Sequence, residues 1–174
     1  MQIPERLVNF ACYGGATSIE FLGMTDVELP TFEAMSETIT GAGIAGEYES
    51  PVAGHLKSQV LKLKWRTMSA AALGLLAPVQ HVLDLRGSVA LQDPMLGVLS
   101  EEAVRIEVRG QVKNFIPGKL EPGKVMETTA DIEAAVIRIT VAGVQVVELD
   151  KFNMVYKING TDYLRQTRVN IGRV

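Results

Sequence analysis

A long alternation of apolar and polar residues from Val79 to Leu91 restricts the fold more than any other feature of this chain. The odd positions are apolar or glycine except His81, and the even positions are mostly polar. Because successive side chains of a strand point to opposite faces, this pattern predicts a long strand with one buried face. We therefore expect a protein built on half-buried β-sheets.

The same two-residue pattern recurs in several other segments. Residues 19–29 predict a first strand that ends at Pro30, and residues 104–113, 144–150 and 152–158 predict later ones. Leucines and a tryptophan on the apolar side of two strands form the predicted core: Leu61, Leu63, Trp65, Leu83 and Leu85. The turn sequences Ala142-Gly143 and Asn159-Gly160 predict hairpins between the later strands.

One helix is expected, over residues 69–77, where Ser69 is a suitable N-cap and Pro78 ends the segment. The 174 residues fit a single domain, 1–174, that is long enough to bury a core. The predicted fold class is mainly β: an antiparallel β-sandwich or squat barrel with one short α-helix.

The apolar positions change parity within residues 126–141. Up to Ala134 the even residues are apolar or neutral, whereas from Ala135 to Val141 the odd residues are apolar. A simple slip of register would expose the core face, so the change predicts a bulge or a sharp bend near Ala135.

A segment of about twenty residues, 31–51, is too long for an ordinary hairpin loop, which spans roughly 2–5 residues. We expect a long extended arm with a flexible tip that packs on another copy of the chain. The residues expected to make this contact are glycines of the tip and apolar residues beside it: Ile39, Gly41, Gly43, Ile44, Gly46 and Tyr48.

The sequence offers little support for catalysis, and we expect no enzyme activity, no cofactor and no metal site. His55 and His81 lie far apart without neighbouring cysteines, and no nucleophile elbow or phosphate-binding loop is present. The single Cys12 is expected to be a buried thiol. The N-terminus is not typical of a signal peptide, and no apolar run is long enough to span a membrane.

Charged residues gather on two predicted strand faces. Glu127, Asp131 and Glu133 share one face of a strand by their spacing, and a basic set at 62, 64 and 66 occupies another. Paired carboxylates occur in glycosidases, but acids on an alternating face are more typical of a solvated strand. The basic set lacks the interleaved aromatic residues of a single-strand-binding surface.

The chain resembles the major tail tube proteins of contractile-tailed phages, of the kind found in P2-like phages and R-type bacteriocins. The matching pieces run in order over about residues 3–172. They are Leu29-Pro30, Gly41-Ala42-Gly43, Leu85-Arg86-Gly87-Ser88, Val108-Arg109-Gly110, and Val144 to Asp150 leading into Tyr156-Lys157-Ile158-Asn159-Gly160.

This resemblance implies a hexameric ring that stacks into the hollow inner tube of a tail, through which DNA passes into the host without specific binding. In such a stack we expect the arm to pack on the next ring. The implied partners are further copies of the chain, the sheath, the baseplate or tube initiator, the tape measure and the tail terminator. The implied location is the virion tail, with assembly in the host cytoplasm. Because a basic wall would retain DNA, the acidic set Glu127, Asp131 and Glu133 is the expected channel face.

Two other functions stay open at this point. The tube of a type VI secretion system, which carries effectors, shares the implied fold and ring. A carbohydrate-binding β-sandwich is the alternative from another class, and it would require an exposed aromatic platform. Trp65 lies in register with the apolar Leu61 and Leu63, which favours a core position.

Overall fold

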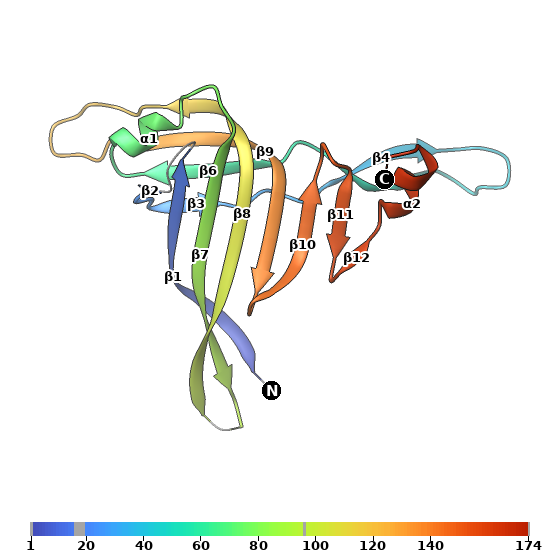
Figure 1. The fold of residues 1–174 in the computed structure, drawn as a ribbon, viewed down its shortest axis with the longest axis horizontal. Coiled ribbons are helices and arrows are strands. Elements are labelled where there is room, and N and C mark those ends of the chain that lie inside the picture. The colour runs from blue at the N-terminus through green and yellow to red at the C-terminus, as the bar shows by residue number, and fades with distance from the viewer. Residues whose placement is uncertain (1, 16–19, 96, 174) are drawn as a thin grey trace.

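The computed structural model describes residues 2–15, 20–95 and 97–173, and most of its strands belong to one antiparallel sheet. The strands of its main row stand side by side in the centre of Figure 1. In spatial order they are β12 (Thr161–Asp162), β11 (Val155–Ile158), β10 (Val144–Asp150), β9 (Thr128–Val141), β8 (Val98–Ile116), β7 (His81–Asp93), β1 (Ile3–Gly15) and β2 (Glu20–Phe21). The predicted β fold class is therefore confirmed.

A second layer covers the apolar face of this row. It contains β3 (Asp26–Glu28), β6 (Val60–Trp65) and the first half of β9, which pairs with β6. The second half of β9 pairs with β10 in the main row, and β8 follows β9 through the same change of direction. Figure 1 shows both strands turning from one layer into the other. The sandwich is thus closed at one corner by strands that change sheets.

The corner contains the predicted bulge. Arg109 pairs with Val136 while Gly110 pairs with Ala134, so Ala135 is the additional residue. This bulge explains the change of parity, because it moves the buried side chains of β9 from even to odd positions without exposing the core.

The core lies between the two layers. All five large residues expected there are buried: Leu61, Leu63, Trp65, Leu83 and Leu85. The indole N–H of Trp65 donates to the carbonyl oxygen of Leu22 at 2.7 Å, so its polar atom is satisfied inside the core. His81, the exception in the alternation of β7, is also buried.

The predicted helix is present but short. Helix α1 (Ala70–Gly74) begins at the expected N-cap, since Ser69 Oγ accepts from the Ala72 backbone N–H at 3.1 Å. It does not reach residue 77 because the following amides bond to carbonyls three residues back, which tightens the chain into turns. A second helix, α2 (Arg165–Asn170), was not predicted, so the expectation of one helix is wrong.

The N-terminal region differs from the prediction. Strand β1 was missed, and the single strand expected over residues 19–29 is two short strands, β2 and β3; residue 19 lies outside the described residues. The Leu22 amide bonds to Cys12 in the main row, whereas the Thr25 amide bonds to Lys64 in the second layer. The chain changes layers at Gly23 (φ +58°), which one continuous strand cannot do.

The C-terminal hairpins match the turn sequences. Ala142-Gly143 and Asn159-Gly160 each have two positive φ angles, as tight hairpin turns of this kind require. The last long strand begins at Val155, not at residue 152, because Met154 has a positive φ angle of +52° that breaks the strand.

The arm is a β-hairpin separate from the large sheet. It consists of β4 (Ala34–Ile39) and β5 (Tyr48–Leu56), and it projects from the molecule beside the C-terminus in Figure 1. It continues to Leu56, beyond the predicted end at 51, because Pro51 pairs within the ladder opposite Ser36. Proline is tolerated there because both strands of a hairpin are edge strands.

Candidate assembly and channel surfaces

The two faces of the arm differ near its tip. Ile39 lies opposite Tyr48 on the face that we call apolar, which also carries Glu37 opposite Ser50, and Thr38 lies opposite Glu49 on the polar face. Ile39, Ile44 and Tyr48 are exposed, although they are large and apolar. A hairpin of two strands is marginally stable by itself in water, so the exposed apolar residues of this hairpin make it a candidate contact surface.

The tip of the arm contains the three glycines singled out in the sequence. Gly43 and Gly46 have φ angles of +95° and +117°, which favour glycine, and a Cβ at Gly41, Gly43 or Gly46 would meet no atom within 4 Å. No lysine or arginine occurs between Thr31 and Leu56, whereas four glutamates do. The arm is therefore open at its tip and acidic.

The base of the arm is held by buried contacts. Gln59 is fully buried, and its side-chain amide donates to the Thr31 carbonyl at 2.9 Å. On β5, Gly54 lies so close to Leu164 that a Cβ there would be 2.7 Å from the leucine side chain. The arm thus leaves the molecule in a direction set by the second layer and the C-terminal segment.

The acidic set expected to form the channel face is only partly brought together. Glu127 precedes β9 and has a φ angle of +57°, so it does not share the strand face with Asp131 and Glu133; this part of the prediction is wrong. Glu133 accepts from Ser58 and from the Gln59 amide and pairs with Lys151. Burial raises its pKa, but these partners outweigh burial and hold the pKa below its ordinary value.

Basic residues lie on the same face as these acids. Lys62 is directly opposite Asp131 in the ladder, and Lys62 and Lys64 form ion pairs with Glu28 at 2.9 Å. The two predicted faces, one acidic and one basic, are therefore one mixed face on the outside of the second layer. The acids that pair with Lys62 and Lys64, Asp26 and Glu28, come from β3 of the same chain.

The uncovered face of the main row carries a larger set of charges, which sequence reasoning missed. One transverse row of directly opposed residues crosses the sheet from β1 to β12. It consists of Tyr13, Asp84, Glu107, Arg138, Glu148, Lys157 and Asp162. We call this face of the main row the ladder face.

Three carboxylates of the ladder face, Asp84, Glu107 and Glu148, each bind two cations. Asp84 pairs with Arg86 at 2.6 Å and with Arg105 at 2.7 Å. Burial raises the pKa of Asp84, but the hydrogen bonds and charges of Arg105 and Arg86 outweigh it and keep the pKa below its ordinary value.

The same arrangement continues across the sheet. Glu107 pairs with Arg109 and Arg138, and Glu148 pairs with Arg138 and Lys157, at distances between 2.8 and 3.1 Å. Charges on neighbouring strands are thus linked into a network, which only strand register could reveal.

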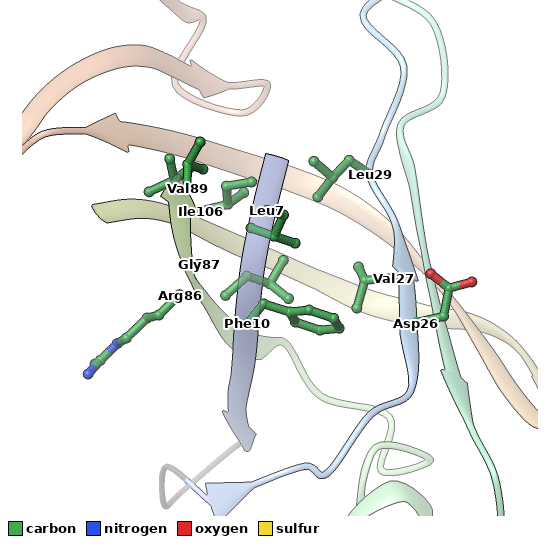
Figure 2. A pocket seen from close by; sticks show the side chains of 11 residues that line it. Leu7, Phe10, Asp26, Val27, Leu29, Arg86, Gly87, Val89 and Ile106 are labelled. Atoms are coloured by element: carbon green, nitrogen blue, oxygen red, sulfur yellow. The ribbon is translucent and has the colours of Figure 1, made fainter. Parts of the chain in front are cut away.

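An apolar groove opens near β1, at the edge of the main row that lies opposite the arm. It has a volume of about 260 Å³ and lies between β1 and the segment that contains β3. In Figure 2, Leu7 and Phe10 come from β1, Val27 and Leu29 lie beside them, and Arg86 points away. Leu7 and Leu29 are both about half exposed, so this part of the apolar face is not covered within one chain.

Other kinds of site find no support in the described part of the chain. No group of three or more His, Cys, Asp or Glu residues there could hold a metal ion. The helices described are all too short or too polar to cross a bilayer. Trp65 is buried, so it contributes nothing to an aromatic platform of the kind that a carbohydrate-binding surface uses.

The fold and these surfaces define a structural β protein with open sheet edges and a projecting arm. The family described as phage tail tube protein FII matches residues 4–172, and this chain belongs to that family. The tail tube protein of Escherichia phage P2 is 31% identical over 182 residues, covering 99% of each protein. The protein is therefore a structural component of a tail tube.

A solved structure supports the fold. A chain in the cryo-EM structure of an extracellular contractile injection system, the PVC sheath/tube terminator in its extended state, superposes with a TM-score of 0.55. The match covers 79% of this chain and 97% of that chain at 9% sequence identity, so it shows a shared fold.

Proposed function

We propose that copies of this chain close into hexameric rings and that the rings stack into the hollow inner tube of a contractile tail. The observation that carries this proposal is the pair of open edges of the main row. Within the described residues, β2 and Leu22 cover β1 only from Cys12 to Gly14, and β12 ends the row on the other side. Exposed edges pair with other chains, and closure around a ring removes them.

The ladder face is the proposed wall of the channel. The apolar face of the main row carries β3, β6, α1 and the arm, and these elements would fill the channel if they pointed inward. With the second layer outside, the charged and uncovered face lines the lumen. In this arrangement Asp131 and Glu133 lie on the outer layer. The alternative is that these two acids line the channel, and the cysteine-labelling experiment below distinguishes the two arrangements.

The arm of each copy packs on an adjacent copy in this proposal. The apolar groove is the favoured receiving surface, because it opens on the side of the main row that carries the second layer, from which the arm departs. It also lies at the β1 edge, whereas the base of the arm lies beside β10 and β11. In a ring closed edge to edge, the arm of one copy therefore reaches the groove of the next.

Family membership supports a proposal for the remaining partners. A tube of this kind would start on a baseplate or tube initiator, enclose a tape measure, be surrounded by a sheath and end at a terminator. DNA would pass through it into the host, and assembly would take place in the host cytoplasm.

Electron microscopy of the purified protein in negative stain, at low and high concentration, tests the assembly. We expect rings with six-fold symmetry or tubes of uniform width. A protein that stays monomeric at every concentration, even with preformed tube ends as seeds, would contradict the proposal.

Cysteine labelling of assembled tubes tests the channel wall. Gln145→Cys places a thiol on the ladder face, and Asp131→Cys places one on the second layer; both positions avoid the core. We expect the thiol at 145 to react with a small maleimide but not with a protein-sized one, and the thiol at 131 to react with both. The reverse result would assign the channel to the second layer.

A cross-link tests the contact between arm and groove. In tubes of the variant that carries both Ile39→Cys and Leu7→Cys, we expect disulfide-linked ladders of subunits under mild oxidation. The pair Thr38→Cys and Leu7→Cys is the control, because position 38 lies on the opposite face of the arm.

A further inference from the structure

A second long loop projects from the molecule on the side opposite the arm. It comprises residues 117–127 and joins β8 to β9 at their ends in the second layer, where Ile116 pairs with Thr129. Figure 1 shows this loop between the ends of β8 and β9, extending away from the arm and beyond β1. Hairpin loops usually span roughly 2–5 residues, so a loop of this length points to a role of its own.

Backbone contacts hold the base of the 117–127 loop in place. The Lys119 amide donates to the Met126 carbonyl at 2.9 Å, and the Met126 amide donates to the Arg66 carbonyl at 2.8 Å. Gly118 lies so close to Met126 that a Cβ at position 118 would be 2.0 Å from the Met126 carbonyl oxygen. The loop is therefore anchored on β6 of the second layer and is not a loose connection.

The tip of this loop presents apolar side chains to solvent. Leu120 is 87% exposed, and Val125 is 56% exposed. Among the described residues, Lys119 pairs with no acid, and Lys124 pairs with Glu121 of the same loop. A loop that is held at its base and apolar at its tip is a candidate for contact with another molecule.

A hollow of about 190 Å³ lies on the other side of the molecule, where the arm begins. Most of its lining is apolar, and Asp150 and Lys151 add one charge of each sign. The apolar residues come from the base of the arm, the end of β10 and the C-terminal segment: Leu56, Leu149, Met154 and Leu164. Leu149 belongs to the core, so the hollow lies on the same side of the main row as the second layer.

We infer that the 117–127 loop of one copy docks on the base of the arm of the adjacent copy in the ring, with Leu120 in this hollow. The inference deepens the proposed function and rests on it for the closure of the ring edge to edge. The loop projects on the β1 side of the chain, and the hollow lies on the β12 side. Because closure joins these two sides, it brings the loop of one copy to the hollow of the next.

Charge also favours a second copy of this chain as the partner. The loop contains two lysines and one glutamate, whereas the arm beside the hollow contains four glutamates and no lysine or arginine between Thr31 and Leu56. One of these glutamates, Glu33, pairs with Lys57, which leaves an acidic excess on the arm. Lys119, next to Leu120, can therefore meet an acid of the adjacent arm.

The contact is the counterpart of the one proposed between arm and groove. At each junction of the ring, the arm reaches across from the β12 side, and the loop reaches back from the β1 side. Each copy thus holds its neighbour from both directions, and the exposed apolar tip of the loop is covered only after closure.

Cross-linking in rings or tubes tests this contact. The variant that carries both Leu120→Cys and His55→Cys has one thiol at the tip of the loop and one at the hollow, which His55 also lines. A short bismaleimide should link its subunits into ladders. An equimolar mixture of the two single variants should give linked dimers and nothing larger, because the two thiols belong to different copies. Leu120→Cys with Gln145→Cys is the control and should not be linked, since position 145 lies on the ladder face.

Leu120→Ser tests the contribution of the apolar tip. Its urea midpoint should equal that of the unchanged protein, because this side chain is exposed in the free subunit. The protein concentration at which rings appear should rise roughly tenfold or more, as expected when burial of one leucine is lost at each junction. Val144→Ser is the matched control: Val144 is also exposed, at 66%, but it lies at the turn between β9 and β10 and should form rings as before.

The outcomes separate this inference from the proposed function. Rings or tubes without a cross-link between positions 120 and 55 overturn the inference and leave the proposed function intact. Equal effects of Leu120→Ser and Val144→Ser on ring formation overturn the role of Leu120. If no rings form under any condition, the proposed function is wrong, and this contact, which rests on it, is wrong as well.

Discussion

Gly110 lies against the backbone of Glu133 at the corner where β8 and β9 change layers. A Cβ at position 110 would be 2.2 Å from the carbonyl oxygen of Glu133, closer than any real contact. The bulge at Ala135 brings the two strands this close. The corner of the sandwich therefore requires the absence of a side chain at one position.

Gly110→Ala should destabilise the fold. Because the obstacle is backbone and not the end of a flexible side chain, the strands must separate, at a cost of roughly 1–3 kcal/mol or more. The free energy of unfolding in urea measures this cost. Gly74→Ala is the control, since a Cβ there meets nothing within 4 Å and alanine favours helix; its stability should be equal or slightly higher. Equal stability of the two variants would contradict the account of the corner.

Changes in the arm should separate folding from assembly. Ile39→Ser together with Tyr48→Ser removes exposed apolar groups, so subunit stability should change by less than about 0.5 kcal/mol for each substitution. Tube growth, followed by electron microscopy, should be lost. Deletion of residues 41–46 should have the same effect. Thr38→Ala, on the polar face, should assemble normally, and tubes of unchanged yield from the double variant would refute the role of the arm.

Protonation of the ladder-face carboxylates in acid should lower the stability of the folded protein. The pKa values of Asp84 and Glu148 are lowered in the folded protein, despite burial, from ordinary values of 3.8 and 4.5. A lowered folded pKa adds stability that is present above the unfolded pKa and is lost as the pH falls through the folded pKa. The urea midpoint should therefore drop below about pH 4.5, and Glu148→Gln should show a shallower drop. An unchanged pH profile in this variant would exclude Glu148 as a contributor.

Cys12 should be unreactive while the protein is folded. Burial, with a smaller contribution from the charge of Asp84, raises the pKa of its thiol to about 12. The thiolate is the reactive form, so a thiol reagent at pH 8 should modify Cys12 only after denaturation. Rapid modification of the native protein would show that β1 opens readily. The inertness of this thiol also makes the single-cysteine labels at 131 and 145 interpretable.

Trp65→Phe should weaken the core without affecting a binding surface. The change leaves the Leu22 carbonyl without its 2.7 Å donor inside the protein, which costs about 1–3 kcal/mol. Thermal unfolding measures the loss. A variant of unchanged stability that lost affinity for a sugar would instead support the carbohydrate-binding alternative.

The local sequence pattern was sufficient to predict those features that depend on residues close together in the chain. Alternation placed Leu61, Leu63 and Trp65 on one face, turn sequences located the hairpins at Gly143 and Gly160, and a change of parity located the bulge at Ala135. The missed elements lack such local signals. β1 has a proline and two register shifts, and α2 is only one and a half turns long.

The sequence by itself determined a β protein with a buried alternating core, a projecting arm and membership of the tail tube family. Only the tertiary structure decided which charges meet. Strand register places Asp84 beside Arg105 and Glu148 beside Arg138, although these residues are distant in the chain, and it places Lys62 opposite Asp131 on what alternation alone treats as separate faces. The physical reason is that alternation fixes the side of a strand on which a residue lies, whereas its neighbours across the sheet depend on register, bulges and strand order, which no short segment encodes.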